Sequence, residues 1–348
     1  METAWYFLIA LMLAVYVVLD GFDFGAGILH LFVARNDEER RTVLGAIGPV
    51  WDGNEVWLLA GGGVLVYAFP KAYAAGFSGF YMPLMMALWL LILRGISIEL
   101  RSHEAHPLWR SFWDGVFAFS STLMSVVLGA ALGNVIRGVP LTAEGYFAGP
   151  LFTDFLPGPH AGVLDWYTVL VGVFAVLTLA AHGAVYLAWK TQGPVHIRSA
   201  RAGRILWPAV AVLGVGVTAA TAVVQPRLYP SLVARPWTWA LALGIAVSLG
   251  VVLAAARRNR ELPAFLGSCG FIAFLLAATA AGMHPNLLVS TLDPAFSLTI
   301  TNAAAGEVSL RIGFVWWSLA MLLAVGYFAY LFYSFRGKVT VDTRGAGY

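Results

Sequence analysis

Charge is scarce in this sequence, and cysteine is almost absent. Only 11% of the 348 residues are Asp, Glu, Lys or Arg, whereas 60% are hydrophobic, and the mean hydropathy is +0.79. This composition excludes an ordinary soluble protein and predicts a membrane protein. The single cysteine, Cys269, excludes an intrachain disulfide and a metal site built from cysteines.

Long polar segments are also absent, so the sequence predicts one polytopic membrane domain over residues 1–348 with no separate soluble domain. Apolar runs of about 20 residues recur along the whole chain, and each is long enough as a helix to cross about 30 Å of hydrocarbon. The predicted spans are roughly 4–33, 53–70, 78–100, 114–136, 163–190, 205–225, 236–256, 263–284 and 309–335.

Ionisable residues are concentrated in the first four of these nine spans. In spans five to eight, His182 is the only internal one. This distribution predicts an all-α protein with two four-helix bundles plus one extra helix. The charge-bearing bundle is expected over residues 1–136, a packing bundle over 163–284 and the last helix over 309–335.

Lysine and arginine are distributed unevenly between the two sides of the spans. The loops after spans one, three, five and seven and the C-terminal tail, which includes Arg344, hold 16 of the 21, and the other side holds 5. Because loops rich in Lys and Arg stay in the cytoplasm, we expect the N-terminus outside and the C-terminus in the cytoplasm. The net charge of +3 reflects this anchoring and does not indicate nucleic-acid binding.

Asp20 and Asp23 lie inside the first apolar run. A carboxylate in hydrocarbon costs about 2.5–3.5 kcal/mol on insertion scales, so these residues need a functional or structural reason. They share one helix face with Gly27, and Gly21 and Gly25 allow a neighbouring helix to approach closely. Proton or ion handling is the favoured interpretation. Hydrogen-bonded contacts that only join helices are the alternative.

A second acidic cluster, with Asp52 and Glu55, begins the second span. By the charge distribution, Asp52 lies near the cytoplasmic end, Glu55 lies one turn deeper, and Asp23 approaches the same side. These groups are predicted to form a ladder of carboxyls that exchanges protons with the cytoplasm. A helix N-cap at Asp52, with Trp51 as an interfacial anchor, is the alternative. It does not account for Glu55 or Asn54.

Arg94, in the third span, is predicted to pair with an aspartate of the first span and to neutralise one buried charge. Nearer the surface, Glu99 and Arg101 are interpreted as a solvated helix end, and Asp114 as a helix N-cap. Among the histidines, only His30 and His182 share a depth at which a haem could bind between helices. The others lie in loops or on the opposite side, so we expect no firmly bound haem and no metal site in this chain.

Two motifs resemble subunit II of the cytochrome bd quinol oxidases, which are bacterial terminal oxidases. They are LDGFDFGAG at 19–27 and PVWDGNEVWL at 49–58. Further matching stretches follow in the expected order over nearly the whole chain: AGFSGFY (75–81), LRGISIELR (93–101), ALGNVIRGVP (131–140), LAAHGAVYL (179–187) and HPNLLVSTLDPAFSLTITNAA (284–304).

The resemblance implies a partner, subunit I of homologous fold, which carries two b haems, one d haem and the quinol site. The complex would oxidise quinol on the outer side of the bacterial cytoplasmic membrane and reduce dioxygen to water. It would take protons from the cytoplasm without pumping them. Small accessory membrane subunits are left open, as is a structural quinone or lipid bound by this chain.

The resemblance also assigns roles to residues of this sequence. Asp52 corresponds to the proton-path aspartate of the family, Asp20 and Asp23 to its D-G-F-D motif, and Arg94 to the arginine of its third span. Glu55 is taken as a further member of the path, with Trp51, Asn54 and Trp57 as supporting residues. One departure is His284, which occupies a position where an aromatic residue is commoner.

Two other functions are kept as alternatives. A proton-coupled secondary transporter would also bury carboxyls, but it should show inverted repeats and broken helices. The only candidate break is Gly61-Gly62-Gly63 in the second span. The other alternative is a purely structural assembly subunit, in which the acidic clusters serve only to join helices.

Overall fold

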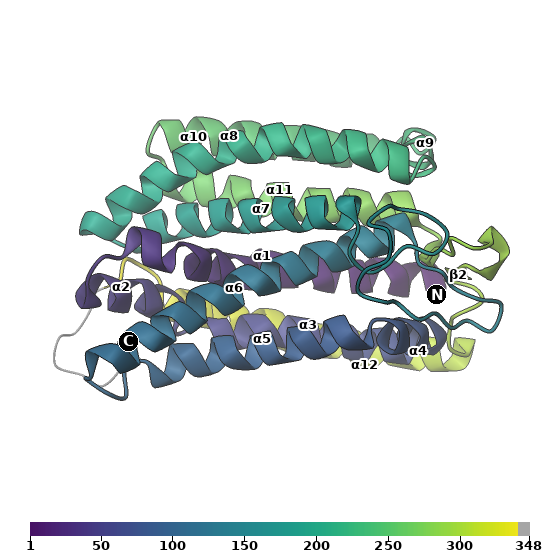
Figure 1. Cartoon of the computed structure of the whole chain (residues 1–348), viewed down its shortest axis with the longest axis horizontal. Coiled ribbons are helices and arrows are strands. Elements are labelled where there is room, and N and C mark those ends of the chain that lie inside the picture. Colours follow the sequence, from purple (N-terminus) through teal and green to yellow (C-terminus); the bar gives the residue numbers. More distant parts are fainter. Residues whose placement is uncertain (340–348) are drawn as a thin grey trace.

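Nine long helices run side by side along the long axis of the molecule (Figure 1) in the computed structural model, which describes residues 1–339. The predicted all-α membrane fold is confirmed. The long helices are α1 (Glu2–Val33), α3 (Trp51–Ala68), α5 (Tyr81–Leu100), α6 (Pro107–Arg137), α7 (Trp166–Lys190), α8 (Gly193–Val224), α10 (Thr238–Arg257), α11 (Glu261–Met283) and α12 (Glu307–Ser334). Short elements connect them: α2 (Asp37–Ile47), α4 (Pro70–Gly79), α9 (Leu228–Val233), η1 (Pro294–Phe296) and the two-stranded sheet of β1 (Asn286–Leu288) and β2 (Leu298–Thr299).

Eight of the described helices are long and apolar enough to cross a membrane, and α3 is not among them. This helix corresponds to the expected span 53–70. Its first two turns hold Asp52, Asn54 and Glu55, which lower its mean hydropathy. It ends before Pro70, which begins α4, because proline cannot continue a helix. The count of nine spans therefore remains a prediction that depends on α3.

Helix α1 lies at the centre and packs against α3, α6, α7 and α11. It approaches α7 so closely that a Cβ atom added at Gly25 would collide with backbone atoms of Leu179 and Gly183. Gly21 faces the same helix through the side chain of Leu179. The predicted small-residue contact is thus made within this chain, and only glycine permits backbones to meet in this way.

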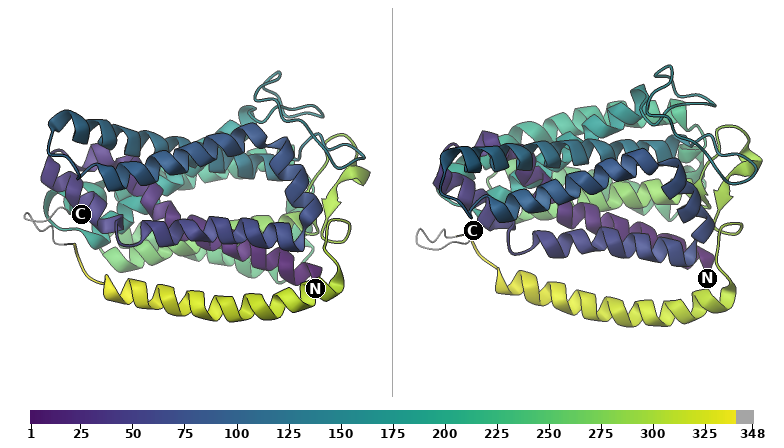
Figure 2. Two further views of the ribbon diagram at one scale, coloured as in Figure 1. Left: turned by 90° about the horizontal axis from the view of Figure 1, so that it is seen from below. Right: turned by 60° about the horizontal axis from the view of Figure 1, so that its bottom comes forward.

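The remaining helices lie on two sides of α1, and α6 and α7 also pack against each other across the predicted division. Helices α3, α5 and α6 lie on one side, and α7, α8, α10 and α11 pack together on the other. Helix α12 runs along the outside of the first group (Figure 2), and none of its most apolar window is buried. At its first turn the indole N–H of Trp5 donates to the carbonyl of Leu310 at 3.1 Å. Because α1 contacts both groups, they share one hydrophobic core.

The chain that follows α12 crosses the end of the molecule as a strap, residues 335–339. Lys190 Nζ, at the end of α7, donates to the Phe335 carbonyl at 2.6 Å. The Val339 N–H donates to the Lys190 carbonyl at 2.8 Å. Lys338 Nζ lies 2.8 Å from a carboxylate oxygen of Glu261, at the start of α11. The strap therefore fastens α12 to the far group of helices.

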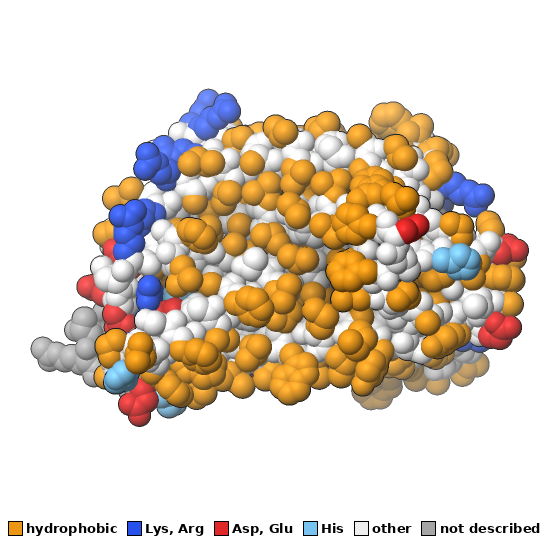
Figure 3. Space-filling view, viewed as in Figure 1, with side chains coloured by type: hydrophobic (Ala, Val, Ile, Leu, Met, Phe, Trp, Pro, Cys, Tyr) orange, Lys and Arg blue, Asp and Glu red, His pale blue; other side chains and the backbone are white. Residues whose placement is uncertain are grey.

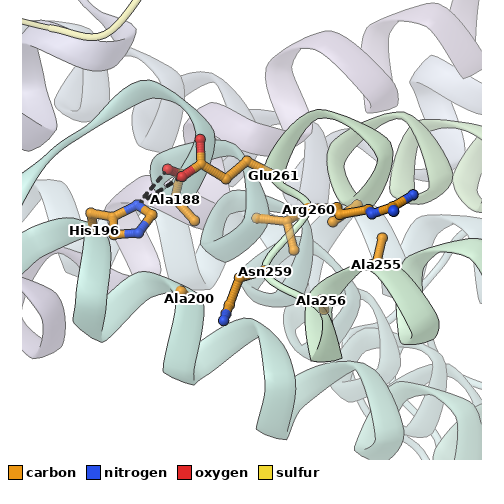
Figure 4. Close-up of a pocket in the computed structure, with 10 residues that line it drawn as sticks. Ala188, His196, Ala200, Ala255, Ala256, Asn259, Arg260 and Glu261 are labelled. Carbon is orange, nitrogen blue, oxygen red and sulfur yellow. Dashed lines mark hydrogen bonds and ion pairs between the residues drawn. The ribbon is translucent and has the colours of Figure 1, made fainter.

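Glu261 also faces His196 of α8 across a small pocket (Figure 4), with His196 Nδ1 3.4 Å from Glu261 Oε1. The cavity is only about 30 Å³, which is room for about two water molecules. It is too small to hold an organic ligand. It lies where α8 and α11 pack together beneath the strap.

Positive charge gathers at one end of the molecule, on the left of Figure 3. This basic end is where α1, α5, α7 and α10 finish and where α3, α6, α8 and α11 begin. The loops that the sequence predicts to be cytoplasmic lie at this end, and the orientation itself stays a prediction. Arg344, which entered that prediction, lies outside the described residues.

At the opposite end, α6 and α7 are joined by a buried ion pair between Arg137 and Asp165. Asp165 is also the N-cap of α7, because its side chain accepts from the backbone N–H groups of Tyr167 and Thr168 at 2.8 Å. Asn134 donates to the Val163 carbonyl at 2.8 Å. These contacts fix the start of the 138–165 loop and hold that end of the bundle together.

Candidate functional site

Arg94 is the centre of an inner cluster, which consists of Asp20, Asp23, Asn54, Glu55 and Arg94. Its Nη1 lies 2.5 Å from Asp20 Oδ1, and both side chains are fully buried. Its Nη2 lies 3.0 Å from Glu55 Oε2. The guanidinium also stacks on the ring of Phe24, 4.2 Å from its centroid. The predicted pairing of Arg94 with an aspartate of the first span is confirmed, and Asp20 is the partner.

Asp23 belongs to the inner cluster through a different contact. Asn54 Nδ2 donates to Asp23 Oδ2 at 2.8 Å and also to the Leu19 carbonyl at 3.2 Å. The second carboxyl oxygen, Asp23 Oδ1, is buried without a hydrogen-bond partner among the described residues. Asn54 thus holds the Asp23 carboxyl in place. The position of Asn54 beside Glu55 in the sequence did not predict this contact.

Asp52 lies apart from these contacts. Its side chain is exposed in the first turn of α3, whereas Asn54 is fully buried. The N-cap of α3 is Val50, so the alternative interpretation of Asp52 as the cap is wrong. Trp51, next to it, packs its indole against Gly95 of α5. Asp52 therefore stands at the basic end of α3, one turn outside Glu55.

The inner cluster contains three carboxyl groups and one guanidinium. A single positive charge cannot offset two fully buried carboxylates and a third that is partly buried, and an uncompensated buried charge costs several kcal/mol. The arrangement can therefore take up and release protons. Glu55 has a partly exposed side chain, 21%, and connects the buried aspartates with the surface of α3. Trp57 lies on the same helix and packs against Phe328 of α12.

A second ionic group, the Asp114 cluster, lies at the basic end. Asp114 Oδ1 is 2.6 Å from both Arg101 Nε and His30 Nε2, and Asp114 Oδ2 is 2.8 Å from Arg40 Nη1. Arg101 continues to Asp37 at 2.8 Å. Four elements, α1, α2, α5 and α6, are tied together by this one carboxylate.

Two sequence interpretations fail at this cluster. Asp114 is not a helix N-cap, because α6 begins seven residues earlier with His106 as its cap. Arg101 is not part of a solvated helix end, since it is 1% exposed. The two residues bind each other across the loop between α5 and α6, and their other partners come from α1 and α2, far away in the sequence, so no local pattern could reveal the cluster. Glu99 is exposed, as expected.

The two histidines considered for haem have protein partners. His182 Nδ1 lies 2.6 Å from Ser268 Oγ, and its Nε2 lies 3.0 Å from the Val18 carbonyl. His30 is bonded to Asp114. Among the described residues, no group of three or more His, Cys, Asp or Glu side chains could hold a metal ion.

A large apolar cavity of about 410 Å³ lies between α1, α6, α7 and α11. It extends from Tyr6 and Asn286 at the end opposite the basic one to Tyr16, one helical turn from Asp20. Its few polar groups include the buried hydroxyls of Tyr16 and Thr178. The volume and lining suit an apolar molecule that carries a few polar atoms.

The three glycines considered as a helix break do not interrupt α3, which is continuous from Trp51 to Ala68. The broken helix expected of a transporter is therefore not found there. The structure gives no support to that alternative at the position where it was expected.

Comparison with known proteins gives one consistent result. The sequence model of the family described as cytochrome bd terminal oxidase subunit II matches residues 1–335. The cytochrome bd ubiquinol oxidase subunit 2 of Bacillus subtilis is 30% identical over 342 residues, covering 97% of this chain and 96% of that protein. The cytochrome bd-I ubiquinol oxidase subunit 2 of Escherichia coli K12 is 29% identical over 366 residues, covering 97% and 95%.

A solved structure shares the fold. A chain of the bd oxidase from Geobacillus thermodenitrificans superposes with a TM-score of 0.74 at 19% sequence identity, covering 96% of this chain and 98% of that one. The similarity extends over almost the full length in every case, so the inner cluster, the Asp114 cluster and the cavity all lie within the matched region.

Proposed function

This chain belongs to the cytochrome bd terminal oxidase subunit II family, and we propose that its inner cluster delivers protons within a membrane quinol oxidase. It is a subunit of a quinol:oxygen oxidoreductase of aerobic respiration, together with a subunit I. On its own it is not the catalyst, because the two b haems, the d haem and the quinol site belong to subunit I. Its task is to support that subunit and to supply part of the protons that dioxygen reduction consumes.

The observation that carries this proposal is the excess of carboxyl over guanidinium groups in the inner cluster. Arg94 balances Asp20 and contacts Glu55, whereas Asp23 has only the amide of Asn54. A purely structural pair would need Arg94 and one acid, and every further buried carboxyl costs free energy. Asp23 is thus the carboxyl that is free to change protonation state.

The basic end is the side from which the protons would enter. Loops rich in Lys and Arg stay in the cytoplasm, and this end carries most of these residues. Asp52 lies exposed there, Glu55 is next inward, and Asp23 and Asp20 are buried deeper. The proposed order from the cytoplasm is therefore Asp52, Glu55 and then the aspartates of α1, with the N-terminus outside.

We further propose that subunit I covers the face formed by α3, α5 and α12. Gly62 and Gly63 of α3 face open space, and small residues exposed in this way are typical of helix–helix contacts in membranes. Asp52 is exposed and Glu55 partly so on the same helix. Asp52 lies at the basic end, open to the cytoplasm, whereas Glu55 lies one turn deeper. A carboxyl at that depth does not face lipid, so we expect another protein to cover Glu55.

The apolar cavity between α1, α6, α7 and α11 is the place where a structural quinone or a lipid chain would bind. Its volume of about 410 Å³ is within the range of ligand pockets. Mass spectrometry of lipids and quinones extracted from the purified complex tests this assignment. If neither a quinone nor a lipid is recovered in stoichiometric amount, the proposal that the cavity binds one of them is wrong.

Replacement of Asp23 by asparagine tests the proton-delivery proposal. The asparagine oxygen can still accept from Asn54, but the side chain cannot carry a proton. We expect normal haem content and a fall in oxidase turnover of about tenfold or more, as for the loss of a proton-transfer group. Asp154→Asn, an exposed aspartate of the 138–165 loop, is the matched control.

The same variant separates the proposal from a purely structural role. A structural role predicts loss of the assembled complex with normal turnover per haem in whatever complex remains. Full turnover per haem in an Asp23→Asn complex would therefore contradict proton delivery through the inner cluster.

A further inference from the structure

His30 is a buried titratable side chain that the proton route proposed above does not use. It is fully buried on α1, and its Nε2 lies 2.6 Å from Asp114 Oδ1. Both oxygens of Asp114 also accept from guanidinium groups, Arg101 on Oδ1 and Oδ2 and Arg40 on Oδ2. The carboxyl is therefore ionised, so Nε2 carries the hydrogen and donates it.

In this hydrogen-bond pattern His30 Nδ1 carries no hydrogen, so its lone pair is free to accept one. It has no hydrogen-bond partner among the described residues. An imidazole held in this way can accept a proton at Nδ1, because the resulting imidazolium is paired with the Asp114 carboxylate. The groups that face it are Asp114 from α6, which favours the charged form, and Arg101 of α5 and Arg40 of α2, which oppose it.

Two more buried polar atoms without a described partner follow in the direction of the inner cluster. They are Ser121 Oγ on α6 and Asp23 Oδ1 on α1. A Cβ atom added at Gly27 would collide with the Oγ and Cβ atoms of Ser121. Gly27 comes four residues after Asp23 and three before His30, so the hydroxyl lies over the stretch of α1 between them.

The three atoms thus follow one face of α1 over about 10 Å, at a rise of about 1.5 Å per residue. An unpaired buried donor or acceptor costs about 1–3 kcal/mol, and buried water normally satisfies such groups. The ring of Phe117, 5.3 Å from the His30 ring centroid, packs beside this face and also reaches Gly27. Three unsatisfied polar atoms in sequence mark a line along which water molecules can join them.

We propose that His30 and Ser121 form an interior branch of the proton route, from the basic end to Asp23. This inference rests on the proposed role of Asp23. Nδ1 of His30 accepts a proton from a hydronium ion at the basic end, leaving water and an imidazolium paired with Asp114. The Nδ1–H bond then breaks, and the proton passes by water and the Ser121 hydroxyl to the Asp23 carboxylate, which becomes neutral. His30 returns to its starting tautomer.

The test compares His30→Gln and Ser121→Ala in the purified oxidase complex. The glutamine amide can still donate to Asp114 but cannot hold a proton, and the Ser121→Ala change removes only the hydroxyl. We expect normal haem content and a turnover lowered about fivefold in each variant. The deficit should grow from mildly acidic to alkaline pH, where protons are scarce, and this change in the pH profile distinguishes proton transfer from altered packing.

His182→Gln is the matched control, because His182 is also a fully buried histidine whose two ring nitrogens both have partners away from this line. Its turnover and pH profile should equal those of the wild type. If His30→Gln fails to assemble, Ser121→Ala decides alone. Wild-type turnover and pH profile in Ser121→Ala would overturn the interior branch.

The Asp23→Asn variant distinguishes this failure from failure of the proposed function. Slow turnover in Asp23→Asn with normal turnover in Ser121→Ala and His30→Gln would reject the branch alone. Normal turnover in Asp23→Asn would reject proton delivery by the inner cluster, and the branch with it.

Discussion

Arg94 of α5 donates to Asp20 of α1 at 2.5 Å, with neither side chain exposed to solvent. The two residues are 74 positions apart in the sequence, and their pair joins two helices. A buried charge that loses its partner is strongly destabilising, whereas a complete pair contributes little net stability. The folded protein therefore requires both partners, although the pair itself adds little to stability. It fixes the depth at which α1 and α5 meet.

Loss of the guanidinium should therefore prevent assembly more than it slows turnover. We expect Arg94→Met to lower the free energy of unfolding by about 3–5 kcal/mol, because Asp20 is left buried and unpaired. The double variant Arg94→Met, Asp20→Asn should recover much of that loss. The thermal stability of the purified complex and its yield measure both effects. No recovery in the double variant would mean that Glu55 or Asp23, rather than Asp20, requires the arginine.

Asp52 offers a test of where protons enter. Since it is exposed and is not the N-cap of α3, Asp52→Asn should leave folding and haem content unchanged. If it passes protons to Glu55, turnover should fall about tenfold, and Asp52→Glu should recover part of the rate. Oxygen consumption at saturating quinol, from neutral to alkaline pH, is the measurement. Equal rates in wild type and Asp52→Asn would remove Asp52 from the route.

The Asp114 cluster should be a major source of stability at the basic end. Asp114→Asn leaves Arg101 buried and short of a counter-charge, so we expect a loss of about 3–5 kcal/mol. Asp154→Asn, in an exposed loop, should cost less than about 0.5 kcal/mol. Thermal unfolding of the two variants in the same detergent checks the difference. Similar stabilities would show that the cluster is not required for folding.

Surface glycines provide a test of the subunit I face. Gly62 on α3 and Gly216 on α8 both face open space in this chain, so Gly→Leu at either should leave the chain itself intact. We expect Gly62→Leu to reduce the amount of haem-bearing partner that co-purifies with this chain, and Gly216→Leu to leave it unchanged. The haem-to-protein ratio reports the result. An equal ratio in both variants would place the partner elsewhere.

Glu39 gives an expectation for pH. The guanidinium of Arg198 beside it lowers the pKa of the Glu39 carboxyl from its ordinary value of 4.5. Because the folded pKa is the lower one, the stabilisation is complete above pH 4.5 and is lost as the pH falls further. Arg198→Gln should therefore destabilise the protein at neutral pH and have less effect in acid. Thermal unfolding across this range gives the comparison, and a difference independent of pH would contradict it.

The sequence was sufficient for features that depend on composition and local spacing. It predicted the all-α membrane fold, the close approach at Gly25 and the pairing of Arg94 with the first span, since buried charge needs a partner. It did not predict the Asp114 cluster, because Asp114, Arg101, His30 and Arg40 come from four elements and meet only when α2 folds back. Arg101 ends α5 just before a loop, and Asp114 comes soon after the same loop, so in isolation both look like ordinary helix-end residues.

Distances along a helix were also easier to predict than exposure. Asp52 and Glu55 are three residues apart, and their relative depth follows from helix geometry. Which of them reaches Arg94 depends on the rotation of α3 against α1 and α5, and the apolar pattern of α3 does not define one buried face. For the same reason the contact between Asn54 and Asp23 could not be derived from the motif.

The strap of residues 335–339 has a consequence for the order in which the chain is completed. Helix α12 leaves the ribosome after α7 and α11, and its tail bonds to Lys190 at the end of α7 and to Glu261 at the start of α11. These anchor points exist only after both helices have been inserted and packed. Fastening of the tail therefore follows the packing of both helices, and a chain that lacks residues 335–339 would lose the contacts that join this end of α12 to α7 and α11.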